Sequence, residues 1–220
     1  DNTIECSSLV SSSFVITVVA ENDTPVGVAD TINVFEGSSV TTTTAGNSVI
    51  ANDTDTEGDN LTVTKLTDPM WHLGGGFTLQ SSGTFIYTHD ASETTTDSFT
   101  YRLTDTFTTT DVLVTINIIP VNDCPSVTSP PIPDINVLED AADTVRNLNS
   151  YFTDAENDPL SYSFINDDTS LATVTLSSAS LTIDYIPEQN GTTTITIFVD
   201  DTQGCNTTQD VFIVNVADVN

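Results

Sequence analysis

One pattern recurs along the chain at intervals of about one hundred residues: an apolar run followed by Asn-Asp or by the start of that pair. The copies are "FVITVVAEND", "VTINIIPVND" and "FIVNVADVN", and their asparagines, Asn22, Asn122 and Asn220, are 100 and 98 residues apart. This period is too long for a solenoid repeat and matches the length of one small domain. We therefore predict three segments: the C-terminal strand and linker of a preceding or neighbouring module (1–24) and two whole modules (25–123 and 124–220).

Within each predicted module, apolar and polar residues alternate with period two. Examples are "TFIYTH" and "DVLVTINII" in the first module, and "LTIDYI" and "TTITIFVDD" in the second. Such runs, rich in Val, Ile, Thr, Phe and Tyr, are typical of antiparallel strands with one packed face. Short turn sequences such as "SSG" and "QNG" separate them. The predicted fold class is all-β, with tandem antiparallel β-sandwiches in a linear array.

The charge balance is strongly acidic, with 32 acidic residues against three basic ones and a net charge of −29. Because no basic surface is available to neutralise phosphates, we expect no nucleic-acid partner and no binding to anionic membranes. No apolar run is long enough to span a bilayer. No leader peptide is recognisable, so we expect a mature or cut-out piece. The acids either form a solvated surface or bind cations, and their clustering at module ends would favour cations.

Acidic and amide side chains do cluster in loops that a sandwich would bring to the N-terminal end of each module. Calcium prefers six to eight oxygen ligands from such groups, although Asp and Asn are also ordinary turn formers. We expect the side chains of each set to approach one another and favour calcium over plain acidic turns. In the first set, Asp53, Asp55, Asp59 and Asp105 should approach Asn22 and Asp23. In the second, Asp154, Asp158 and Asp200 should approach Asn122 and Asp123, with Glu156 and Asp201 as further candidate ligands in the same runs.

The first module, from "PVGVADTINVFEGSSV" to "TDVLVTINIIPVND", closely resembles the bacterial cadherin-like and Ig-like tandem repeats of giant surface adhesins. The second, with "PPIPDINVLEDAADTV" and "FTDAENDPLSYSF", resembles the related dystroglycan-type cadherin-like repeat, and the Cys-bearing tails resemble a hyalin-type repeat. The resemblance implies Ig-like or cadherin-like sandwiches in extracellular rods, often stiffened by calcium, that act as spacers in adhesins or filaments. It also implies that Glu36, Asp97 and Glu139 reach the C-terminal ends of their modules and complete the calcium sites there.

Covalent modifications are also predicted. Cys124 opens the second module and Cys205 precedes its last strand, so we expect a Cys124–Cys205 disulfide, with a partner for Cys6 outside this chain; three buried thiols are the alternative. Sequons begin at Asn22, Asn52, Asn60, Asn190 and Asn206, although abundant Thr makes chance matches common. Thr31 and Thr144, in "DTI" and "DTV", resemble O-glycosylation signals of surface-coated bacteria.

The sequence gives little support for an enzyme. Only His72 and His89 could act as neutral-pH bases, and no nucleophile–base–acid set is apparent. Trp71 is either a packing residue or a platform for a sugar. We therefore expect an extracellular structural repeat, joined to neighbouring copies or modules in a linear fibre, with strand donation between neighbours as one means of joining. A carbohydrate-binding or cell–cell adhesion module is the alternative, and a protein-docking domain comes third.

Overall fold

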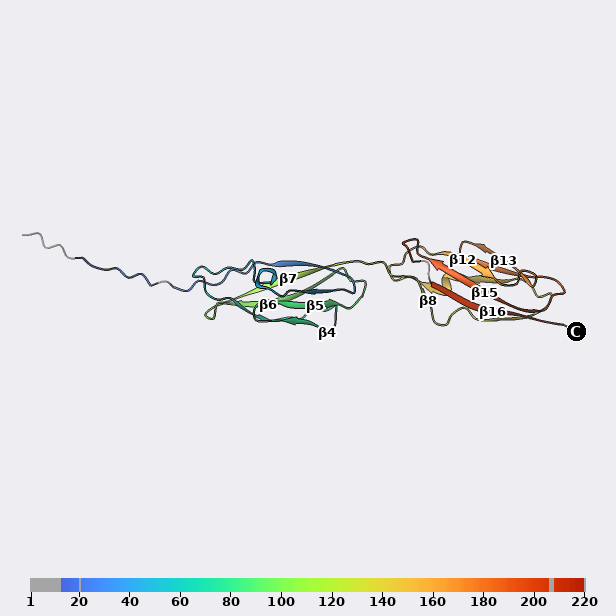
Figure 1. Ribbon diagram of the computed structural model, residues 1–220, viewed down its shortest axis with the longest axis horizontal. Coiled ribbons are helices and arrows are strands. Elements are labelled where there is room, and N and C mark those ends of the chain that lie inside the picture. The colour runs from blue at the N-terminus through green and yellow to red at the C-terminus, as the bar shows by residue number, and fades with distance from the viewer. Residues whose placement is uncertain (1–12, 20, 206–207, 220) are drawn as a thin grey trace, which may run out of the picture. The chain divides into compact units, whose positions relative to one another are not determined.

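The computed structural model describes residues 13–19, 21–205 and 208–219 (Figure 1). Its contacts divide the chain into two compact units, and strands are the main regular structure of each. The first unit comprises residues up to Val34, Ser38–Asp90 and Thr96–Asn117. The second comprises Phe35–Gly37, Ala91–Thr95 and the residues from Ile118 onward.

The first unit is a sandwich of two sheets with the strand orders β1-β7-β6-β3 and β2-β5-β4. A short 3-10 turn, η1, follows β2. The elements are β1 (Asp30–Phe35), β2 (Ser39–Thr41), η1 (Ala45–Asn47), β3 (Thr62–Lys65), β4 (His72–Leu79), β5 (Phe85–His89), β6 (Thr96–Thr104) and β7 (Thr109–Ile119).

The core of the first unit lies between these sheets. β6 and β7 pair antiparallel, with Phe99 opposite Val114 and Tyr101 opposite Val112. These four side chains are at most 4% exposed, whereas the residues between them along each strand face outward. The alternation seen in the sequence is therefore the alternation between core and surface.

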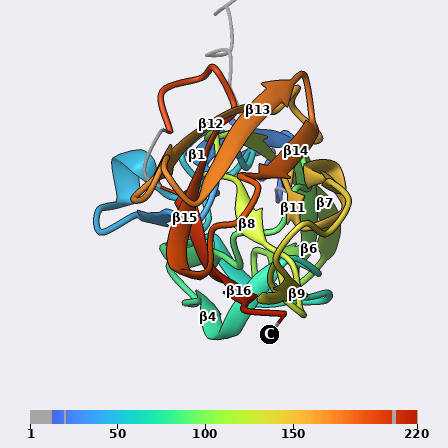
Figure 2. The ribbon, with the colours of Figure 1, turned by 90° about the vertical axis from the view of Figure 1, so that its right-hand side faces the viewer.

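The second unit has a four-stranded sheet, β12-β15-β16-β9, a three-stranded sheet, β10-β14-β13, and a small pair, β11-β8. Figure 2 gives a second view of the orange strands β13 and β14 and the red strand β16. The elements are β8 (Ser126–Val127), β9 (Ile135–Leu138), β10 (Thr144–Asn147), η2 (Leu148–Ser150), β11 (Phe152–Thr153), β12 (Ser161–Asn166), β13 (Ala172–Ser177), β14 (Ser180–Tyr185), β15 (Gly191–Asp200) and β16 (Thr208–Ala217).

The last strand, β16, is an inner strand of the four-stranded sheet of the second unit. It pairs antiparallel with β15 and parallel with β9. Its inward side chains, Phe212, Val214 and Val216, are at most 2% exposed and belong to the unit's hydrophobic core. The last strand therefore connects two neighbours and contributes one whole face to the core.

These sheets confirm the predicted all-β sandwich fold. The structure adds strands that the alternation did not reveal, namely β4, with three consecutive glycines and an irregular register against β5, and the short β2, β8, β10 and β11. Residues 13–19, part of a predicted strand, belong to no strand, and all seven are exposed. Among the helical segments of the described chain, none has the length and apolarity that a membrane span requires.

Candidate cation site

Three carboxylates converge in the second unit. Glu36 follows β1, Glu93 lies in the loop before β6, and Asp123 precedes β8. One oxygen from each lies within 4.8 Å of the others. Oxygens bound to one calcium ion at 2.3–2.6 Å would have separations of about this size.

Further acids of the second unit accept hydrogen bonds around this cluster. Glu156 Oε1 accepts a 2.9 Å hydrogen bond from the Asp123 backbone N–H. Asp154 Oδ1 accepts one of 2.9 Å from the Asp158 N–H. The second oxygens of Asp154 and Glu156, together with Glu36 Oε1, are buried and have no hydrogen-bond partner among the described residues. Buried, unpaired carboxylate oxygens are costly unless a cation compensates them.

The electrostatics of the second unit follow from this crowding. Burial raises the pKa of Glu93, and the carboxylates of Glu36, Glu156 and Asp123 raise it further. Burial, followed by the charges of Asp154, Glu156 and Asp201, likewise raises the pKa of Asp158. A divalent cation would relieve this like-charge repulsion, so the residues present fit a calcium ion.

The linker asparagine of the second unit holds the chain in place through its amide nitrogen. Asn122 Nδ2 donates a 2.8 Å hydrogen bond to Asp201 Oδ2. Asp201 is fully buried, and its other oxygen accepts a 2.7 Å bond from Gln203 N. The hydrogen bond from Asn122 is the main cause of the lowered pKa of Asp201. Asp201, rather than Asp200, therefore meets the linker; Asp200 Oδ1 accepts from Thr202 N in the adjoining turn.

The first unit repeats this arrangement. Asn22 Nδ2 donates a 2.9 Å hydrogen bond to Asp105 Oδ2, as Asn122 does to Asp201. The Asp23 N–H donates to Glu57 Oε2 at 3.1 Å, as Asp123 does to Glu156. Two hydrogen bonds from Thr108 and Phe107 backbone N–H groups, 2.7 Å each, also reach Asp105, and the Thr108 bond is the main cause of its lowered pKa. The two Asn-Asp linkers thus share one local geometry.

Asp55 and Asp59 lie beside the first linker's partner, Glu57. Asp55 Oδ1 accepts hydrogen bonds from the N–H groups of Glu57 and Asp59, and Asp55 Oδ2 is buried without a hydrogen-bond partner among the described residues. This loop therefore also presents an uncompensated carboxylate oxygen.

Two of the predicted ligands have other partners. Asp53 accepts from Val28 N at 2.8 Å and from the Tyr101 hydroxyl at 2.7 Å, both within the first unit. Asp97 lies inside β6 and accepts from Met70 N, Trp71 N, Ser98 N and the Tyr87 hydroxyl. Both carboxylates accept hydrogen bonds from neutral donors on each oxygen, which connect loops to the sheet. Glu93 and Glu57 were not predicted from the sequence, because their positions depend on how the loops fold.

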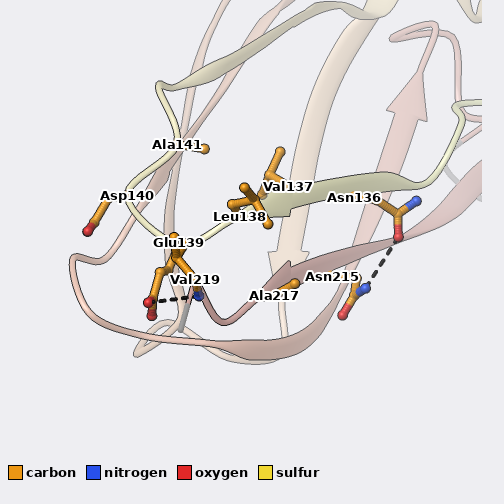
Figure 3. A pocket seen from close by; sticks show the side chains of 9 residues that line it. All are labelled: Asn136, Val137, Leu138, Glu139, Asp140, Ala141, Asn215, Ala217 and Val219. Atoms are coloured by element: carbon orange, nitrogen blue, oxygen red, sulfur yellow. Dashed lines mark hydrogen bonds between the residues drawn. The ribbon is translucent and has the colours of Figure 1, made fainter.

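Glu139 makes the same contacts near the C-terminal end of the second unit that Glu36 makes beside the Asn122-Asp123 linker. Glu36 N donates to Ile119 O, and Glu36 Oε2 accepts from Val121 N at 3.2 Å. Correspondingly, Glu139 N donates to Ala217 O, and Glu139 Oε1 accepts from Val219 N at 3.1 Å (Figure 3). A groove of about 680 Å³ adjoins this contact.

The predicted modification sites have the following positions. Cys124 and Cys205 form a disulfide across 81 residues. Asn52, Asn60, Asn190 and Thr31 are exposed. Asn22 is hydrogen-bonded to Asp105, and the Thr144 hydroxyl to that of Tyr185. Cys6, Asn206 and the linker residue Asn220 lie outside the described residues.

The two histidines of the first unit lie within one of its sheets, and Trp71 lies at the edge of a groove. His72 and His89 face each other in the register of β4 and β5, and His89 is fully buried. Trp71 is 38% exposed and lines a groove of about 630 Å³ with Asp68, Met70 and residues of β6 and β7.

Comparison with known proteins gives two domain matches. Residues 22–120 match the family described as bacterial cadherin-like domain, and residues 122–214 match the family described as bacterial Ig domain. No curated protein sequence matches the chain.

Solved structures with the same fold include cadherin ectodomains. The chain is similar to human protocadherin-24 EC1-2, with 13% identity, a TM-score of 0.60, and coverage of 91% of this chain and 100% of that one. For mouse cadherin-23 EC22-24 the identity is 22% and the TM-score 0.56, with 90% and 68% covered. An endo-fucoidan hydrolase of glycoside hydrolase family 107 matches at 21% identity and a TM-score of 0.35 over 90% of this chain. The chain spans only 29% of that enzyme, and so low a score carries no argument.

Proposed function

We propose that the chain, whose residues 22–120 match the bacterial cadherin-like domain and whose residues 122–214 match the bacterial Ig domain, is an extracellular structural repeat of a surface adhesin or filament. In this proposal the modules are residues 25–123 and 124–220, calcium stiffens the linkers, and neighbouring modules or copies join in a linear fibre, strand complementation being one means. The role is structural rather than enzymatic. The observation that carries the proposal is the cluster of Glu36, Glu93 and Asp123.

Calcium would act on the linker through that cluster. Its three ligands come from segments far apart in the sequence, and one of them, Asp123, belongs to the linker itself. Asp154 and Glu156 supply buried oxygens without hydrogen-bond partners among the described residues. An ion bound to these oxygens would fix the course of the linker and remove the like-charge repulsion that, after burial, contributes to the raised pKa of Glu93.

Thermal unfolding with and without calcium tests the proposal. Extracellular calcium modules bind with dissociation constants of about 10⁻⁴–10⁻³ M, so millimolar calcium should raise the melting temperature relative to chelator. Glu93→Gln and Asp123→Asn should reduce this calcium-dependent rise. Asp184→Asn, at an exposed position of β14, is the matched control and should keep it. Coinciding melting curves in chelator and in calcium would contradict calcium stiffening.

A second candidate function is carbohydrate binding, favoured by the groove beside Trp71. An indole face bordered by carboxylate and hydroxyl groups is a common sugar-binding chemistry, and Asp68, Ser98 and Thr115 line this groove. A glycan array distinguishes the two roles: binding that is lost in Trp71→Ala supports recognition of sugars, and an array without binding supports the spacer.

A further inference from the structure

Residues 13–19 form an apolar segment whose side chains are open to solvent. Phe14, Val15, Ile16, Val18 and Val19 are between 74% and 89% exposed, and no strand includes them. So many consecutive exposed apolar side chains mark a surface that another protein part covers.

The position of this segment before the Asn-Asp pair shows which of its side chains would face a core. Counting back from Asn22, Asn122 and Asn220 matches Phe14, Ile16 and Val18 with every second residue of β7 and β16. The matched residues, Val114, Ile116, Ile118, Phe212, Val214 and Val216, are all at most 4% exposed. The alternate positions, those of Val15, Thr17 and Val19, match residues that face outward or are partly exposed.

The strands that flank β7 and β16 indicate what kind of sheet residues 13–19 would join. β7 lies between β6 and β1, and β16 lies between antiparallel β15 and parallel β9. Because both strands already fill these places, neither sandwich of a second copy has a vacant last-strand position for residues 13–19. The partner must be a sandwich of the same kind that lacks its own last strand.

We infer that residues 13–19 are the last strand of a third sandwich, inserted between an antiparallel and a parallel neighbour, with Phe14, Ile16 and Val18 facing its core. The body of that sandwich precedes the segment in the same polypeptide, because β7 and β16 each follow their antiparallel partner within one chain. The inference rests on the proposed function as a repeat array and names the partner in it. It does not depend on calcium.

A strand graft tests this inference with the chain's own second unit. Residues 208–219 are replaced by residues 10–21, which puts Phe14, Ile16 and Val18 at the core positions of β16. The second unit should still unfold cooperatively in urea. Within the graft, Ile16→Asp should abolish this transition, whereas the matched outward change, Thr17→Asp, should leave its midpoint nearly unchanged.

A second graft is the control, because it shows whether the second unit folds with the last strand of another sandwich in place of β16. Residues 110–121, which include most of β7, are placed at 208–219 in the same way. If this graft folds and that of residues 10–21 does not, the inference is wrong. It is also wrong if Ile16→Asp and Thr17→Asp have equal effects.

A shorter graft is used if neither long graft folds. It retains Asp210, and with it the hydrogen bond from Ile132 N that both long grafts remove. Only residues 212–219 are replaced, by residues 14–21, and the same two variants are compared. A folding constant at least tenfold lower for Ile16→Asp than for Thr17→Asp supports the inference; equal constants overturn it. The calcium response is measured separately, so failure of the graft leaves the calcium proposal standing.

Discussion

At the scale of single residues, the acidic side chains fall into two groups according to their partners. Asp53, Asp97 and Asp105 accept hydrogen bonds from backbone N–H or hydroxyl groups, which hold loops and linkers in place. Asp154 and Glu156 keep one buried oxygen without such a partner among the described residues. Neutral donors compensate the first group, whereas a cation would compensate the second.

Asp30 in β1 should make the stability of the first unit depend on pH. Burial, followed by the charge of Asp53, raises its pKa from 3.8 to about 6. Between these values the folded chain holds a proton that the unfolded chain releases, so the free energy of unfolding falls as pH rises through this window. Asp30→Asn should therefore lose less stability between pH 4 and pH 6.5 than the wild type does, as measured by urea midpoints of the first unit.

The control for Asp30 is Asp184→Asn, which changes an exposed carboxylate of the second unit. It should leave the pH dependence of the first unit as in the wild type. Equal pH slopes for wild type and Asp30→Asn would show that Asp30 does not contribute.

At the scale of elements, β7 depends on close contact with the segment that follows the first linker. A Cβ atom added at Gly27 would lie 2.1 Å from Val112 Cγ2. Because Val112 belongs to the packed face of β7, Gly27→Ala should destabilise the first unit by about 1–3 kcal/mol. Gly74→Ala in β4, where no atom lies within 4 Å of the added Cβ, should leave the urea midpoint nearly unchanged or slightly higher. Equal midpoints for the two variants would contradict this account.

The sequence predicted the long strands because each buries one face, and β6, β7, β15 and β16 alternate accordingly. It missed β4 because three glycines carry no alternation. The cation cluster was predictable only in part. Asp123 follows from its place in the repeat, but Glu93 joins Glu36 through folding of a loop that has no local signature. Asp97 was predicted as a calcium ligand because of its residue type. Its carboxylate instead accepts hydrogen bonds from the backbone of Met70 and Trp71, which are distant in sequence.

At the scale of the whole molecule, the two units differ in their dependence on oxidation. The Cys124–Cys205 disulfide closes 81 residues of the second unit, and no cysteine lies among the described residues of the first. On the chain-entropy account, such a loop contributes about 4 kcal/mol to stability. Cys124→Ser with Cys205→Ser should therefore lower the unfolding transition of the second unit and leave that of the first unchanged. Calorimetry in oxidising and reducing buffer measures this, and equal shifts of both transitions would contradict it.

The same disulfide decides which residues bear tension when the chain is stretched. A pull that arrives through Asp123 passes at Cys124 across the sulfur bridge to Cys205 and leaves through β16, so the residues between the two cysteines are outside the load path. Even if the second unit unfolds, the residues between the two cysteines cannot extend while the disulfide is intact. Reduction would release about 270 Å of hidden contour length at roughly 3.3 Å per residue. Redox state thus sets how far this part of the chain extends under load, a quantity that single-molecule stretching measures directly.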